Sequence, residues 1–180
     1  MHERKKQRLP GFDYSAPGAY FVTICVQGMQ CRFGEVRNSN IVLNEVGMKA
    51  RQCWLDLPNH YINCSLDEYV IMPNHVHGIL HIVGNGLNNL KVTSPFPTEC
   101  QPNVKQHGLP EIIRGFKTFS SRRINEITTE HSFRWQKSYY ERVVRDKNEL
   151  HLIREYICNN PLSWELDKNN SDVKGNELFM

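Results

Sequence analysis

The sequence predicts an α+β domain in which helices pack on an antiparallel sheet. Segments rich in β-branched and aromatic residues alternate with segments of helical apolar period, in the order strand, hairpin, helix, strand, strand, helix, strand, helix. The chain has 180 residues, 39% of them hydrophobic, which suits one domain with its own core. This order contains a βαββαβ core, typical of a ferredoxin-like or RRM-like sandwich, followed by a C-terminal helix.

The first half of the chain supplies the first strand, a hairpin and a helix. The β-branched and aromatic run 19–28, with Gly18 before it, predicts a buried strand. Asn38-Ser39-Asn40 has the turn chemistry of a hairpin. Asn44 is a suitable N-cap for a helix that we expect to end at Pro58. Its helical spacing is carried by Val46, Met48, Ala50, Trp54 and Leu55.

The remaining elements follow in the same way. Strands are predicted over 66–72 and 75–83, joined by a turn at Pro73-Asn74. The Gly-, Asn- and Pro-rich segment 84–108 predicts a flexible surface loop. A helix begins at Pro110, a strand covers 135–145, and a last helix runs from an Asp146 N-cap through Asn160 to Pro161. The expected domain is therefore 18–168, between a basic arm over 1–17 and a polar tail over 169–180.

The positive charge is unevenly distributed. The net charge is only +3, but residues 105–150 carry ten Lys and Arg against six Asp and Glu, and residues 1–10 carry four against one. Such concentration is typical of a surface that binds phosphate groups, although a solvated helix face is the simpler interpretation of charge alone.

Composition also excludes some classes. No apolar run approaches the length of a membrane span, and no apolar segment follows the basic N-terminus as in a secretory signal. The six cysteines form no CxxC pair, which favours reduced thiols in a cytoplasmic protein. We also expect that the protein does not bind membranes.

Two groups of residues are candidates for chemistry. His75 and His77 are two apart in a strand, so both side chains leave the same face and could share a divalent metal with a third ligand. Tyr156 and Asn160 are four apart on the edge of the last helix, offering a phenol beside an amide oxygen. Each residue also has an ordinary structural interpretation. Together they would suit Mg²⁺ or Mn²⁺ and a tyrosine that attacks a phosphodiester.

These segments resemble a known family. The segment 72–80 (MPNHVHGIL) is similar to the His-hydrophobic-His motif of HUH endonucleases, and 135–165 resembles the C-terminal block of the single-tyrosine HUH transposases. The nearest branch is the REP-associated tyrosine transposases, with their YIxxNP signature. The resemblance covers about 18–169 and implies His75 and His77 as metal ligands, Tyr156 as nucleophile and Asn160 as third ligand, where many relatives carry the longer Gln.

The same resemblance implies a dimeric ferredoxin-like enzyme that nicks and rejoins single-stranded, hairpin-bearing DNA through a 5′-phosphotyrosine, here in the bacterial cytoplasm and at the nucleoid. The basic block would then hold the DNA backbone. Its expected DNA-binding residues are Arg114, Lys117, Arg122, Arg123, Arg134 and Lys137. Trp135, Tyr139 and Tyr140 could stack on unpaired bases, or fill the sheet face instead.

Two alternatives stay open. A domesticated, non-catalytic protein could bind single-stranded or hairpin DNA or RNA as a regulator. A histidine-triad nucleotide hydrolase would need a third histidine at position 79, where this chain has Ile79.

Overall fold

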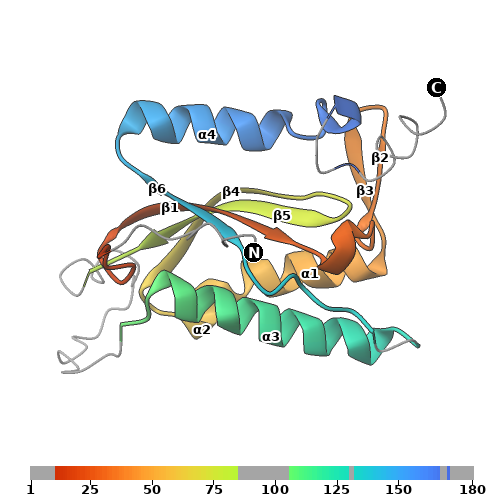
Figure 1. Ribbon diagram of the computed structural model, residues 1–180, viewed down its shortest axis with the longest axis horizontal. Helices are drawn as coiled ribbons and strands as arrows, with labels where there is room; N and C mark the ends of the chain where they lie inside the picture. Colours follow the sequence, from red (N-terminus) through yellow and green to blue (C-terminus); the bar gives the residue numbers. More distant parts are fainter. Residues whose placement is uncertain (1–10, 85–105, 130–131, 167–169, 171–180) are drawn as a thin grey trace, which may run out of the picture.

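A four-stranded antiparallel sheet forms the centre of the computed structural model, which describes residues 11–84, 106–129, 132–166 and 170. The strand order is β4-β5-β1-β6, with every neighbouring pair antiparallel (Figure 1). This is the arrangement expected for a βαββαβ core, and it confirms the predicted fold class. The strands are β1 (Gly18–Cys25), β4 (Cys64–Ile71), β5 (His75–Ile82) and β6 (Tyr140–Val144).

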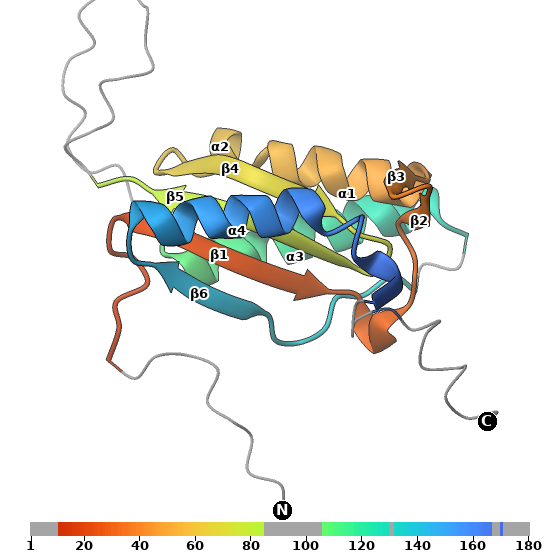
Figure 2. The same cartoon turned by 90° about the horizontal axis from the view of Figure 1, so that it is seen from above.

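Helices cover both faces of this sheet. The helices α1 (Glu45–Leu55) and α3 (Leu109–Ile127) lie on one face, with the short α2 (Leu57–His60) beside them, and α4 (Lys147–Asn159) crosses the other face (Figures 1 and 2). The predicted N-cap of α1 is confirmed, since the Asn44 side chain accepts a hydrogen bond from the Gly47 amide. Short 3₁₀ turns occupy Gln27–Met29 and Trp164–Leu166.

The predicted hairpin is confirmed as a separate two-stranded sheet, formed by β2 (Gly34–Arg37) and β3 (Asn40–Leu43). Its two turn residues, Asn38 and Ser39, both have positive φ angles, of 48° and 61°. Two consecutive residues in the left-handed region make the two-residue turn whose twist matches the flanking strands.

The apolar side chains form two unequal clusters. The larger lies between the sheet and the α1/α3 layer, and includes Trp54, Phe116 and Trp135. A Cβ on Gly78 would come within 2.3 Å of the Trp54 ring, so glycine at this strand position lets the Trp54 side chain pack directly on the sheet. The smaller cluster holds α4 on the opposite face through Phe21, Ile79, Ile153 and Ile157.

Three predicted boundaries are wrong. The first strand ends at Cys25 rather than at residue 28, because Gln27–Met29 form a 3₁₀ turn. Pro58 does not end the helical region, because it occupies the first turn of α2, where a missing backbone N–H costs nothing. The last strand begins at Tyr140 rather than at residue 135. Trp135 instead makes an isolated bridge with Val26, and its indole donates to the buried Ser120 hydroxyl at 2.8 Å. Burial in the core removes Trp135 from the residues that could stack on a base.

Most of the predicted arm, loop and tail lies outside the described residues, since 1–10, 85–105 and 171–180 are not among them. Within the part of the chain that the structure describes, no helix combines the length and apolarity needed to cross a membrane.

Candidate functional site

His75 and His77 lie side by side on β5, on the sheet face that α4 covers. Both side chains are buried, and their ring centroids are 4.4 Å apart. In the antiparallel register, they pair with Cys25 and Thr23 of β1. The alternation of a strand therefore places the two imidazoles together, as the sequence predicts.

Hydrogen bonds to each Nδ1 orient these rings. The Asn74 amide nitrogen donates to the Met29 carbonyl, so its oxygen faces His75 and accepts from Nδ1 at 2.8 Å. Because Nδ1 of His75 carries the proton, Nε2 keeps its lone pair. Nδ1 of His77 lies 2.9 Å from the Thr23 hydroxyl. The Asn74 oxygen can only accept and so fixes the tautomer of His75, whereas the Thr23 hydroxyl can donate or accept and orients the ring of His77; such partners are typical of histidines that bind a metal through the other nitrogen.

His77 is uncharged at neutral pH. Burial, reinforced by the neighbouring His75, holds its pKa well below the ordinary histidine value. A neutral imidazole is the form that donates a nitrogen lone pair to a metal or accepts a hydrogen bond.

Tyr156 brings its hydroxyl to this pair of histidines. Its oxygen lies 3.3 Å from Nε2 of His77, and the two rings are 5.2 Å apart. Its side chain is still 47% exposed, so the phenol is open to a large substrate from one side. The separation of 79 residues between the two makes this contact a product of the tertiary fold.

Two local devices define α4, the helix that carries this tyrosine. At its start, the predicted Asp146 N-cap is confirmed, because the carboxylate accepts from the Glu149 amide. The Glu149 carboxylate also accepts from the amide of Arg145, the residue before the N-cap, which is one position earlier than in a standard capping box. Ile153 and Ile157 are buried against the sheet, and Tyr156 lies beside this stripe.

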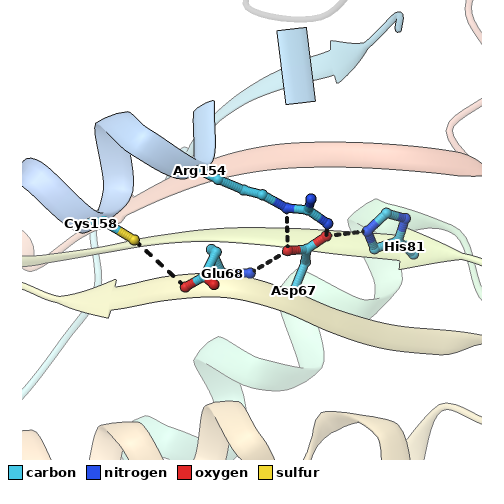
Figure 3. Close-up of polar contacts among 5 residues, drawn as sticks. All are labelled: Asp67, Glu68, His81, Arg154 and Cys158. Atoms are coloured by element: carbon cyan, nitrogen blue, oxygen red, sulfur yellow. Dashed lines mark hydrogen bonds and ion pairs between the residues drawn. The ribbon is translucent and has the colours of Figure 1, made fainter. Parts of the chain in front are cut away.

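An ion pair fixes α4 to the edge strand β4. Arg154 donates from Nε and Nη2 to the two oxygens of Asp67, at 2.9 and 2.7 Å, and His81 lies 2.8 Å from the same carboxylate (Figure 3). The bidentate contact with Arg154, followed by the hydrogen bond with His81, holds the pKa of Asp67 well below its usual value. Nothing in the sequence pairs Asp67 with Arg154, which are 87 residues apart.

Asn160 follows α4 as its C-cap residue, one helical turn beyond Tyr156. Its side chain is buried, and among the described residues its Oδ1 has no hydrogen-bond partner. Tyr156 contacts His77, and Trp164 contacts His75 with ring centroids 6.1 Å apart. Asn160 lies between these two contacts along the chain.

The donor set fits a divalent cation. A buried amide oxygen without a partner is costly unless something binds it, and the hydrogen bonds at Nδ1 direct Nε2 of both histidines to that role. Over the described ranges, no three His, Cys, Asp or Glu side chains gather into a metal site. A metal at His75 and His77 would therefore need a donor of another type, such as Asn160.

The predicted DNA-binding residues separate into two places. Arg114, Lys117, Arg134 and Lys137 line one groove of about 800 Å³ between α3 and the segment that leads to β6, here called the basic groove. Arg122 lies outside this lining and pairs with Glu126 at 3.7 Å. Arg123 also lies outside it, 3.8 Å from Asp56 at the end of α1.

Lys117 is bound within the protein itself. Its Nζ donates to the backbone carbonyls of Gln136 at 2.5 Å and Lys137 at 3.1 Å. Burial lowers the pKa of this ammonium. Its first role is therefore to hold the 136–137 backbone against α3, whereas Arg114 has no comparable bond to that segment among the described contacts.

The chain resembles a solved transposase in fold. The structure of a REP-associated tyrosine transposase bound to a REP hairpin matches with a TM-score of 0.57 at 14% identity, over 87% of this chain and 74% of that one. The chain therefore shares the fold of that transposase, as the sequence resemblance implies. It matches no protein-family model.

A closer relative defines the family. The chain is 37% identical to an uncharacterised protein of Haemophilus influenzae over 173 residues, which cover 93% of each protein. This chain belongs to the same family as that protein.

Sequence reasoning missed the residues that support the site. Thr23 and Asn74 orient the histidines, and Asp67 with Arg154 fixes the tyrosine helix. Asn74 directly precedes His75, but the sequence indicates only a turn at Pro73-Asn74, so its role as a hydrogen-bond partner of His75 was not predicted. The other three become visible only once β1, β4 and α4 are placed around β5.

Proposed function

We propose that this chain is a transposase-like, metal-dependent tyrosine endonuclease that nicks and rejoins single-stranded DNA next to a hairpin. The observation that carries this proposal is the Tyr156 hydroxyl, 3.3 Å from Nε2 of His77, whose ring in turn packs against that of His75. The REP hairpin bound to the solved structural neighbour supports hairpin DNA as the substrate class.

The metal site would be formed by Nε2 of His75, Nε2 of His77 and Oδ1 of Asn160. Two imidazoles and one amide oxygen leave open positions, which suits Mg²⁺ or Mn²⁺ held together with substrate oxygens. When bound, the cation would polarise the phosphate oxygens and neutralise the negative charge that develops during transfer.

The covalent step exchanges one phosphodiester for another. The Tyr156 oxygen attacks phosphorus, the bond from phosphorus to the 3′ oxygen breaks, and the phenolic proton ends on the released 3′ hydroxyl. The 5′-phosphotyrosine keeps the energy of the broken bond, so rejoining to a 3′ hydroxyl needs no external energy source.

The hydrogen bond between Tyr156 and His77 has a consequence for this step. One nitrogen lone pair cannot bind a metal and accept a proton at the same time. A ligand role for Nε2 of His77 therefore excludes that atom as the general base for the phenol.

The basic groove supplies the binding surface in this proposal. Arg114, Arg134 and Lys137 would hold the DNA backbone through phosphate contacts that carry no sequence information. We further propose a homodimer acting in the bacterial cytoplasm and at the nucleoid. Light scattering on the 21.1 kDa chain tests the dimer, which a monomer mass would contradict.

The test of catalysis is formation of a covalent adduct. The protein is incubated with labelled hairpin oligonucleotides whose single-stranded flanks are randomised, with Mn²⁺, Mg²⁺ or EDTA, and products are separated on a denaturing gel. We expect a metal-dependent adduct that Tyr156→Phe abolishes. Tyr69→Phe is the matched control, because its hydroxyl contacts only Arg51 on the other side of the sheet among the described hydrogen bonds.

Two outcomes would contradict the proposal: no adduct with any metal, or an adduct that persists in Tyr156→Phe. Binding that survives EDTA without cleavage would favour the non-catalytic regulator instead. The histidine-triad alternative has no structural support, because position 79 holds a buried isoleucine packed on Phe21 and α4.

A further inference from the structure

A second cavity opens beside the proposed catalytic residues: Tyr156 and His77 form part of its lining, and most of its other side chains have no role in the proposed chemistry. It has a volume of about 660 Å³ and lies between α4 and the β6 edge of the sheet; we call it the tyrosine cavity. Its floor includes Phe21 and Tyr140, and its wall on α4 includes Leu152 and Tyr156. The volume lies in the range of small-molecule pockets.

Two large side chains in the cavity lining are exposed to solvent although they are mainly apolar. Tyr140 is 51% exposed and Leu152 is 64% exposed, on opposite sides of the cavity. Phe21 lies between the aromatic rings, with centroids 6.5 Å from Tyr140 and 6.0 Å from Tyr156. Such a group of exposed apolar side chains beside a reactive residue indicates a binding surface.

The tyrosine cavity adjoins the basic groove. Gln136 and Tyr139 line both, so the two meet where the chain passes from α3 to the edge strand β6. The groove offers cations, and the cavity offers aromatic and aliphatic faces beside an Arg142–Glu149 ion pair. A ligand that fits both sites carries negative charges for the groove and flat apolar groups for the cavity. Single-stranded nucleic acid has both, in its phosphates and its unpaired bases.

We propose that the tyrosine cavity binds one unpaired base of single-stranded DNA, next to the phosphate that Tyr156 attacks. The base stacks on Tyr140 and packs against Leu152, while the adjoining phosphates continue into the basic groove. The Gln136 amide and the Ser138 hydroxyl are among the polar groups of the lining that can hydrogen-bond the base edge. The position beside Tyr156 rests on the proposed function, but the base-binding site does not.

The test separates base binding from backbone binding. Two end-labelled probes are used: a dT 12-mer, and a 12-mer of tetrahydrofuran abasic sites with the same charge. Fluorescence anisotropy is measured in EDTA with Tyr156→Phe protein, so that no cleavage contributes. We expect the dT 12-mer to bind about tenfold more tightly than the abasic probe, in line with the stacking of a base on an aromatic ring.

Substitutions in the cavity should remove this difference. Tyr140→Ala and Leu152→Ala are each expected to weaken dT 12-mer binding by about fivefold or more, and to leave the abasic probe unchanged. Tyr140→Phe keeps the ring and should bind normally. Leu162→Ala is the matched control for Leu152→Ala, because Leu162 is 62% exposed and lies outside the cavity lining.

Equal affinity for both probes would overturn the proposal, as would equal losses on both probes in the cavity variants. Thermal melting of each variant shows whether it is folded. If Tyr140→Ala does not fold, Leu152→Ala still tests the proposal, because Leu152 is exposed and its loss should not affect the fold. Base-dependent binding without any adduct would contradict the proposed catalysis alone. An adduct without base-dependent binding would contradict the base site alone.

Discussion

Arg154 on α4 and Asp67 on β4 form a bidentate ion pair that connects the tyrosine helix to the far edge of the sheet, at 2.9 and 2.7 Å (Figure 3). Arg154 lies two residues before Tyr156 on the same helix. The apolar contact that holds α4 is small, with Phe21, Ile79, Ile153 and Ile157 as its buried members. The ion pair therefore contributes to the position of the tyrosine as well as to the fold.

Replacing Asp67 should impair transfer more than DNA binding. Asp67→Asn removes the charge and one of the acceptors of Arg154, so α4 is held less firmly over the histidines. We expect adduct formation to slow by about tenfold or more, because small displacements of a reacting group are costly, with unchanged affinity for single-stranded DNA. Glu68→Gln is the control, since the Glu68 side chain contacts Cys158 at 3.9 Å, whereas its hydrogen bond to Asp67 comes from the backbone amide, which the substitution keeps. A parallel loss of binding would show general unfolding instead.

The same carboxylate predicts a dependence of stability on acid. Hydrogen bonding by Arg154 lowers the pKa of Asp67 in the folded protein, so the unfolded chain binds the proton first as the pH falls. The stabilisation is complete above the unfolded pKa of about 4 and is lost as the pH falls towards the folded value. Urea unfolding of the wild type and Asp67→Asn should differ by about 1 kcal/mol at pH 6, after solvent screening, and converge towards pH 2. A constant difference across this range would contradict the assignment.

We expect Asn160 to contribute more to metal affinity than to the stability of the fold. Its buried Oδ1 has no hydrogen-bond partner among the described residues, so Asn160→Ala removes an uncompensated polar group. We expect the metal-free variant to unfold within about 1 kcal/mol of the wild type, while its affinity for Mn²⁺, measured by calorimetry, falls about tenfold or more. Asn63→Ala provides the contrast, because buried Asn63 bonds the His107 backbone twice and its loss should destabilise the fold. Unchanged Mn²⁺ affinity in Asn160→Ala would remove Asn160 from the ligand set.

Arginines inside and outside the basic groove should differ in their effect on DNA affinity. Arg114→Ala removes a cation from the groove, so binding to single-stranded DNA should weaken, and the slope of log affinity against log salt should flatten by about 0.7. Arg122→Ala should change neither quantity, because Arg122 pairs with Glu126 outside the groove. Fluorescence anisotropy at several salt concentrations measures both. Equal effects of the two variants would contradict the groove as the DNA path.

Local patterns predicted most of the fold, because local physics decides those features. The N-caps Asn44 and Asp146 and the turn at Asn38-Ser39 depend on residues within a few positions of each other, and all three are confirmed. The strand predicted from 135 fails because Trp135 is withdrawn into the core, where its indole finds the Ser120 hydroxyl. That contact joins residues from different elements, and no short-range pattern records it.

In the candidate site, too, local sequence patterns predicted some features and tertiary packing decided the others. Strand alternation placed His75 and His77 on one face, and helical spacing placed Tyr156 and Asn160 on one edge, so the sequence by itself determined which residues could act together. Only the tertiary structure decided that the Tyr156 phenol meets His77, that Thr23 and Asn74 orient the imidazoles, and that Arg114 lines the groove while Arg122 and Arg123 do not. The reason is geometric: periodicity fixes the direction of a side chain within its own element, whereas its partners depend on the packing of elements far apart in the chain.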